Sequence, residues 1–120
     1  MKPFIDDTQF GSITISGKIY SCDVVISIYG NVRKRAKDLS KMKYGTSHKV
    51  SLDEAKDLYE TGAKQLIIGT GQTGYVTLSP EAAEFFRQKE CTVQLFPTQQ
   101  AIKIWNETQE TAIGLFHVTC

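Results

Sequence analysis

The sequence predicts a single α/β domain, residues 1–120, with a largely parallel central sheet. From Ser51 onward, apolar runs of strand length alternate with helical patterns of about three turns, and the loops between them are short. Strands and helices that alternate in this way are typical of βαβ units. At 120 residues and 41% hydrophobic content, the chain has enough apolar side chains for a core without metal or disulfide.

The first part of the chain predicts a β-hairpin and then a basic segment. Residues 10–15 and 18–28 read as two strands joined by a turn at Ser16-Gly17, and the second strand has an apolar face of period two. Residues 33–43 hold six bases and one acid, and the spacing of Val32, Ala36, Leu39 and Met42 predicts a helix there.

The regular part begins with a capping box, Ser51-Leu52-Asp53-Glu54, whose helix is expected to continue to Gly62. Ser79 followed by Pro80 predicts the start of another helix, and Thr98 is expected to act as the N-cap of a third. The remaining predicted elements are strands 64–69, 91–96 and 111–118 and helices 80–90 and 99–108.

If the later strands are parallel, their carboxyl ends bring polar groups from four segments to one edge of the sheet, where open α/β folds usually bind ligands. These segments are residues 46–48, 69–74, 97–98 and 117–120. An antiparallel final strand would remove His117 and Cys120 from this edge. The ligand-binding candidates are Arg33, Arg35, Ser47, His48, Gly69, Thr70, Gly71, Thr98, Asn106 and His117.

The loop at residues 69–74 spells Gly-x-Gly-x-x-Gly, the string of a dinucleotide fingerprint. In that fingerprint the last glycine lies in the following helix and a carboxylate ends the next strand. Here the helix signal comes only at Ser79, and the strand ending at Phe96 is followed by Pro97. We therefore expect no nicotinamide or flavin cofactor, and interpret the loop as a tight turn or a small-anion cradle.

His48, His117 and Cys120 also suggest a metal site or a Cys-His nucleophile. No spacing fixes their geometry, so we expect no metal and no catalytic residue.

Arg33 and Arg35 have the chemistry to clamp an anion or to remain solvated. The basic segment has the residue types that bind RNA, but the chain has a net charge of only +1 and no RNA-module signature, which favours a solvated face over nucleic-acid binding.

Three cysteines without a CxxC pair, and an N-terminal stretch without an apolar targeting region, favour a cytoplasmic protein. No apolar run is long enough to span a bilayer, so we expect no membrane insertion.

Several segments together resemble the Mth domain family: YGTSH at 44–48, LIIGTG at 66–71, Pro97-Thr98 with Ala101 and Trp105-Asn106, and FHVTC at 116–120. This family comprises uncharacterised archaeal and bacterial proteins related to a vertebrate adipogenesis-associated protein and to mitochondrial respiratory complex I assembly factor three. The resemblance implies a three-layer α/β domain with a mixed, mostly parallel sheet and an added N-terminal hairpin layer. It implies no established catalytic residues. Trp105 and Gln94 depart from residues common in the family.

Two functions follow as hypotheses. The first is a non-enzymatic binding or assembly module that acts through a groove at the carboxyl edge, with a protein partner or as a homo-oligomer. The second is an enzyme or sensor that binds a small anionic or nucleotide-type ligand through the loop at residues 69–74.

Overall fold

The structure, a computed structural model, describes residues 2–119. Its centre is a mixed five-stranded sheet in the order β5-β4-β10-β7-β9. β7 is parallel to both β9 and β10, whereas β4 is antiparallel to β10 and to β5. The predicted α/β class and mixed sheet are therefore confirmed. The strands are β4 (Val24–Ile26), β5 (Val32–Lys34), β7 (Gln65–Gly69), β9 (Thr92–Phe96) and β10 (Ala112–Phe116).

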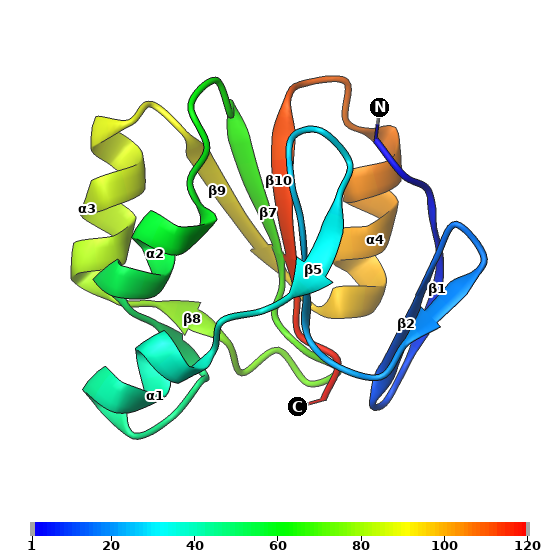
Figure 1. The fold of residues 1–120 in the computed structure, drawn as a ribbon, viewed down its shortest axis with the longest axis horizontal. Coiled ribbons are helices and arrows are strands. Elements are labelled where there is room, and N and C mark those ends of the chain that lie inside the picture. The colour runs from blue at the N-terminus through cyan, green and yellow to red at the C-terminus, as the bar shows by residue number, and fades with distance from the viewer. Residues whose placement is uncertain (1, 120) are drawn as a thin grey trace.

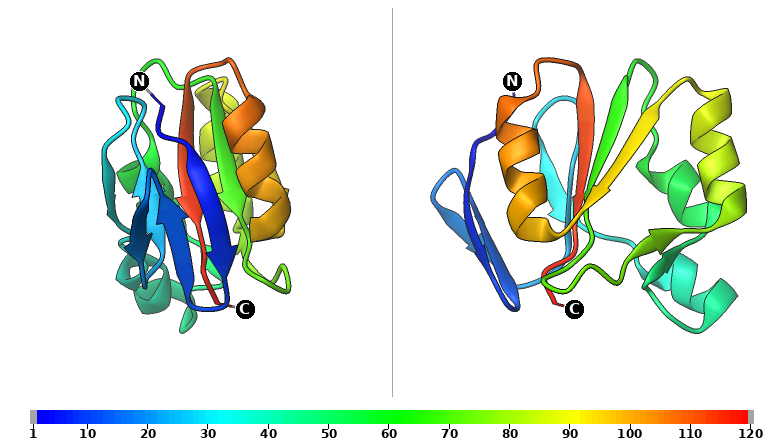
Figure 2. Two further views of the ribbon diagram at one scale, coloured as in Figure 1. Left: turned by 90° about the vertical axis from the view of Figure 1, so that its right-hand side faces the viewer. Right: turned by 180° about the vertical axis from the view of Figure 1, so that it is seen from behind.

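Both faces of this sheet are covered, which gives three layers (Figure 1). Two helices, α2 (Leu52–Leu58) and α3 (Pro80–Gln88), cover one face. The other face carries α4 (Thr98–Glu107) and a separate antiparallel sheet of β1 (Ile5–Gln9), β2 (Ser12–Ile15) and β3 (Lys18–Tyr20), which faces the viewer in the left panel of Figure 2. The short helix α1 (Asp38–Tyr44) and the parallel pair β6 (Lys49–Val50) and β8 (Thr77–Leu78) complete the described chain.

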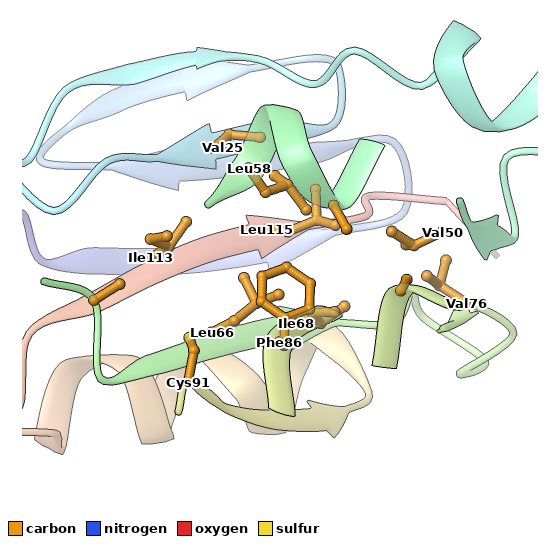
Figure 3. Close-up of a cluster of buried hydrophobic side chains, with 13 residues drawn as sticks. Val25, Val50, Leu58, Leu66, Ile68, Val76, Phe86, Cys91, Ile113 and Leu115 are labelled. Atoms are coloured by element: carbon orange, nitrogen blue, oxygen red, sulfur yellow. The ribbon is translucent and has the colours of Figure 1, made fainter. Parts of the chain in front are cut away.

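Each covered face has its own hydrophobic core. Between the sheet and the helices α2 and α3, Phe86 packs over Leu66 and Ile68 of β7 (Figure 3). On the opposite face, the rings of Trp105 and Phe116 meet edge to face at 5.9 Å. Because it contributes to both cores, β10 is buried at all five of its residues, as expected for a central strand covered on both faces.

The N-terminal region contains the predicted turn, but its strands begin and end at other residues than predicted. The Ser16-Gly17 turn joins β2 to β3, and both residues have positive φ, the geometry of a tight hairpin. The prediction of one strand over 18–28 is wrong: the chain bends after Tyr20 and starts again as β4 in the central sheet. β1, on a segment with no predicted strand, supplies the third strand of the layer.

The basic segment is not one helix. Its first part forms β5, paired with β4, and only its second part forms α1. The proposed apolar stripe fails because Met42 is 85% exposed. Strand pairing and the burial of Arg35, described below, prevail here over a weak helical pattern.

The later helices follow their predicted starts more closely than their ends. Ser51 and Ser79 accept hydrogen bonds from the backbone N–H groups of Glu54 and Ala82, so both are N-caps as predicted. α2 nevertheless ends at Leu58 rather than near Gly62. Thr98 is not the N-cap of α4, because Pro97 holds that position and the Thr98 hydroxyl bonds elsewhere.

Candidate functional site

The polar segments meet at the carboxyl edge of the parallel strands, at the bottom of Figure 1 near the last described residues. β10 runs parallel to β7, with Phe116 opposite Gly69. His117 therefore joins the loop at residues 69–74 at this edge, whereas Cys120 lies outside the described residues. The β1–β2 turn also reaches the edge, since the Gly11 N–H donates to the Val118 carbonyl.

The backbone donors of the glycine-rich loop are used inside the protein. The N–H groups of Thr70 and Gln72 donate to the carbonyls of Phe96 and Thr119, at 2.8 and 2.7 Å. The Gly71 N–H donates to the Thr98 hydroxyl at 2.9 Å. An anion cradle needs backbone N–H groups that point at the ligand, and these three already have partners.

The Thr98 hydroxyl also donates to the His117 carbonyl at 2.7 Å. One buried side chain thus ties the glycine-rich loop to the C-terminal segment. Gly69 allows this close approach, since a Cβ there would lie 2.9 Å from the Thr98 hydroxyl oxygen and 3.2 Å from the Thr98 Cα.

Behind the edge lies a buried ionic cluster, which we call the Arg35 cluster, formed by Arg35, Glu54, Asp23 and Ser40. Arg35 binds Glu54 with two nitrogens, Nε at 2.6 Å and Nη2 at 3.0 Å, and Asp23 through Nη1 at 3.0 Å. Its Nη2 also donates to the Ser47 carbonyl, and the Ser40 hydroxyl donates to Glu54. Burying these charges is tolerable because every one has a partner.

Asp23 connects the Arg35 cluster to the edge. Its Oδ2 lies 2.7 Å from His117 Nδ1, and its Oδ1 accepts the Val118 N–H at 3.0 Å. Burial raises the pKa of Asp23, but the hydrogen bonds from His117 and Val118 and the charges of His117 and Arg35 outweigh it, leaving a pKa of about 2. An ionised Asp23 can only accept, so His117 Nδ1 carries the proton toward it.

On the far side of the imidazole, His117 Nε2 lies 3.2 Å from the Thr119 hydroxyl. Carboxylate, imidazole and hydroxyl thus follow one another in the order used by nucleophilic hydrolases. That chemistry also needs free donors where an oxyanion develops. The nearest loop N–H groups are already bonded, and Asp23 is shared with Arg35. The arrangement therefore holds three chain segments together rather than assembling a complete catalytic site.

The His48 ring packs against His117, and the Tyr75 ring packs against His48 in turn. The His48 and His117 rings meet edge to face at 5.4 Å, and the Tyr75 ring lies 6.4 Å from His48. Tyr75 is 62% exposed and Phe10, in the β1–β2 turn, is 70% exposed. The edge thus presents aromatic surface around a polar centre whose hydrogen bonds are internal.

The predicted site residues divide into three groups. At the carboxyl edge the structure brings together Ser47, His48, Gly69, Thr70, Gly71, Thr98 and His117. Arg35 lies behind them, buried and paired. Arg33 and Asn106 lie elsewhere: Arg33 is on the surface with Asp57 at 2.8 Å, and Asn106 exchanges two hydrogen bonds with the Ile5 backbone.

Sequence reasoning missed Asp23, Glu54 and Ser40 as members of this site. Asp23 carried a usable signal, because a carboxylate inside an apolar strand-like run must be paired if it is buried. Glu54 was explained by the capping box, but its side chain binds Arg35 and Ser40 instead.

Three prominent surface depressions in the described part of the chain are lined by residues other than His48, His117 and the glycine-rich loop. Within residues 2–119, no three His, Cys, Asp or Glu side chains are placed to hold a metal ion. None of the helices described between residues 2 and 119 has the length and apolar character needed to cross a membrane.

The fold and sequence have clear relatives among solved structures. The conserved hypothetical protein PH1505 from Pyrococcus horikoshii OT3 is 34% identical, with a TM-score of 0.88 over 97% of this chain and 98% of that one. A structure named MT938 is also 34% identical, with a TM-score of 0.83 over 99% and 100% of the two chains. At 15% identity, a Mth938-like domain from Bordetella pertussis shares the fold, with a TM-score of 0.64 over 97% of this chain and 85% of that one.

A family model described as "Protein of unknown function (DUF498/DUF598)" matches residues 5–113. Together with the Mth938-like structure, this match confirms the resemblance to the Mth domain family. The chain is thus a member of the DUF498/DUF598 family, whose function is unknown.

Proposed function

We propose that this protein is a non-enzymatic binding or assembly module that docks a protein partner on the carboxyl edge of its sheet. The observation that carries the proposal is the contrast at this edge between internally bonded polar groups and exposed aromatic rings. Phe10 and Tyr75 are 70% and 62% exposed at this edge, where the neighbouring polar groups bond to one another. Exposed aromatic residues on a rigid surface are the usual anchors of protein interfaces.

The edge is also held rigidly, which suits docking. The turn that carries Phe10 is tied to Val118 through Gly11, and Gln72 reaches Thr8 across the same corner. Tyr75 follows the loop whose backbone bonds to Phe96, Thr98 and Thr119. A surface that is ordered before binding loses little conformational entropy when a partner arrives.

The alternative, a small-anion site in the glycine-rich loop, has less support. Its N–H donors at Thr70, Gly71 and Gln72 serve Phe96, Thr98 and Thr119. An anion would have to break these bonds, and each costs about 0.5–1.5 kcal/mol to replace.

The test compares two tyrosines of similar exposure at opposite ends of the sheet. Tyr75 is at the carboxyl edge, whereas Tyr29, 73% exposed, is in the turn between β4 and β5 at the other end. A photo-crosslinking amino acid at position 75 should capture one specific protein in lysate of the source organism, and the same group at position 29 should not. Phe10→Ser and Tyr75→Ser should then weaken binding of that protein at least tenfold, with Tyr29→Ser as the matched control.

Thermal unfolding of the three variants checks that each remains folded. Equal capture from positions 29 and 75, or binding that survives both edge substitutions, would refute docking at this edge.

A further inference from the structure

The two outer strands of the central sheet differ in how they are protected. β5 is only three residues long and carries Arg33 and Lys34, the short and charged form that discourages pairing with another chain. β9, at the other edge, has five residues, Thr92-Val93-Gln94-Leu95-Phe96, and no charge. In the right panel of Figure 2, β9 lies in front of β7 between α3 and α4, and no helix crosses it.

The hydrogen-bond pattern identifies which groups of β9 point outward. The Thr92 N–H donates to Lys64, and the Phe96 carbonyl accepts from Thr70, so these residues face β7. In a parallel pair alternate residues bond to the neighbouring strand. Val93 and Leu95 therefore direct their N–H and C=O groups away from the sheet, as two donors and two acceptors.

An apolar groove runs beside these groups, between α3 and β9. Leu78, Ala83, Cys91, Val93 and Leu95 line it, with Arg87 and Glu90 also at its wall. Leu95 is 39% exposed although it is a large apolar residue in a strand. The edge thus combines unused backbone groups with adjacent apolar surface, the two requirements for adding a strand to a sheet.

We propose that two copies of this chain join edge to edge through β9, antiparallel about a two-fold axis at Gln94, to form one continuous sheet. In this register Val93 is opposite the partner's Leu95 and Leu95 is opposite the partner's Val93. Both pairs exchange two N–H···O bonds, so all the outward groups are satisfied. Gln94 faces the partner's Gln94 in the non-hydrogen-bonded pair between them.

The charges on α3 favour a second copy over an unrelated peptide. Glu81 lies in the first turn of α3 and Lys89 directly follows its last turn, while Glu84 and Arg87 between them already form an ion pair within the helix. The two-fold axis places α3 antiparallel to the partner's α3. The acidic start of each helix, at Glu81, then faces the basic end of the other, at Lys89, a complementary arrangement that forms an isologous contact. On the same side, Leu95 covers the partner's Val93.

This surface is separate from the carboxyl-edge surface proposed for partner docking, so the two proposals fail independently. Leu95→Lys should weaken self-association at least tenfold while leaving the capture at position 75 unchanged, and Tyr75→Ser should leave self-association unchanged.

Light scattering after size-exclusion chromatography tests the proposal first. At a few hundred micromolar, the native chain should have the mass of a dimer. Leu95→Lys places a charge at the centre of the contact and should weaken association at least tenfold. Met42→Lys adds the same charge to an apolar side chain that is 85% exposed on α1, and should associate like the native chain.

Engineered cysteines test the register. In the proposed register, the Cα atoms of residue 94 in the two copies lie about 4.5 Å apart across the two-fold axis, within disulfide range. Gln94→Cys should therefore form a disulfide-linked dimer on mild oxidation. Thr92→Cys should not, because the two positions 92 are about 14 Å apart along the paired strands. The native chain, oxidised in the same way, shows how much disulfide-linked dimer its own cysteines form. Burial raises the pKa of Cys91 to about 11, which keeps this thiol protonated and slow to react at neutral pH.

A native chain that stays monomeric at these concentrations would overturn the proposal. So would association that Leu95→Lys leaves intact, or cross-linking of Thr92→Cys that equals that of Gln94→Cys.

Discussion

Arg35 shows how a single buried charge can organise a site. Its guanidinium contacts side chains or backbone from three separate parts of the chain, at Asp23, Ser47 and Glu54. These contacts draw β4, the segment before β6 and α2 together behind the carboxyl edge. Arginine suits this role because its planar fork presents several donors and stays protonated when buried.

We predict that Arg35→Met costs roughly 3–5 kcal/mol of unfolding free energy, because it leaves Asp23 and Glu54 buried without their cation. Arg33→Met is the matched control, two positions away. Its ion pair with Asp57 is 44% and 37% exposed, and exposed pairs contribute about 0–1 kcal/mol. Urea unfolding of both variants measures the difference. Equal costs would show that the Arg35 cluster contributes no more than a surface pair.

Asp23 predicts a loss of stability in acid. Its pKa in the folded protein is about 2, below the ordinary value of 3.8. A lowered pKa means that the folded state binds this proton less tightly than the unfolded state, so Asp23 stabilises the fold above pH 4. That contribution, roughly 2 kcal/mol, should be lost as the pH falls from about 4 through 2. Urea unfolding across this range should show a shallower pH dependence for Asp23→Asn; an unchanged slope would contradict the prediction.

At the scale of an element, β10 shows why a glycine sits in a central strand. A Cβ on Gly114 would lie 2.5 Å from the Phe116 ring and 3.0 Å from the Trp105 ring. Because both rings are fully buried, neither has room to move away. The missing side chain is what allows α4 to pack closely on the sheet.

We predict that Gly114→Ala destabilises the protein by about 1–3 kcal/mol through overpacking. Gly62→Ala provides the comparison. Gly62 has φ +98° and nothing within 4 Å of the added methyl, so that substitution costs backbone strain, about 1–3 kcal/mol, without crowding any ring. Thermal unfolding with near-UV circular dichroism measures both stability and the Trp105 environment. The Trp105 signal should change in Gly114→Ala alone; an unaltered signal would show that the crowding is relieved without moving the ring.

At the scale of the whole molecule, the basic segment is less basic on the surface than in sequence. Of its six bases, Arg35 is buried in the Arg35 cluster and Arg33 is paired with Asp57. The segment also divides between β5 and α1. A phosphate-binding face needs several free cations on one surface, and this division reduces their number.

The two proposed surfaces occupy different parts of the molecule. The docking surface lies where β7 and β10 end, whereas the self-association surface follows the outer side of β9. A dimer formed through β9 therefore carries two docking surfaces, one on each copy. Such a bivalent module would bind a multivalent partner more tightly than either surface alone.

Local sequence patterns were sufficient to predict the helices and strands of the second half of the chain. Ser51 and Ser79 begin helices because their hydroxyls satisfy backbone donors at the very next turn. β7 and β10 are apolar runs buried in the sheet, and the alternation of patterns already indicated them together with the edge strand β9. The convergence of Gly69, Thr98 and His117 followed from the same alternation, once the final strand is parallel.

What only the tertiary structure decided depends on partners distant in sequence. The break between β3 and β4 cannot be seen locally, because it is set by Asp23 meeting Arg35 and His117. Arg35 and Thr98 also bond to residues distant in sequence, so sequence patterns alone indicated a surface base and a helix N-cap. Hydrogen bonds that span many residues carry no short-range sequence signal. Only the folded structure shows that the backbone N–H groups of the glycine-rich loop are bonded inside the protein, and this bonding argues against an anion site there.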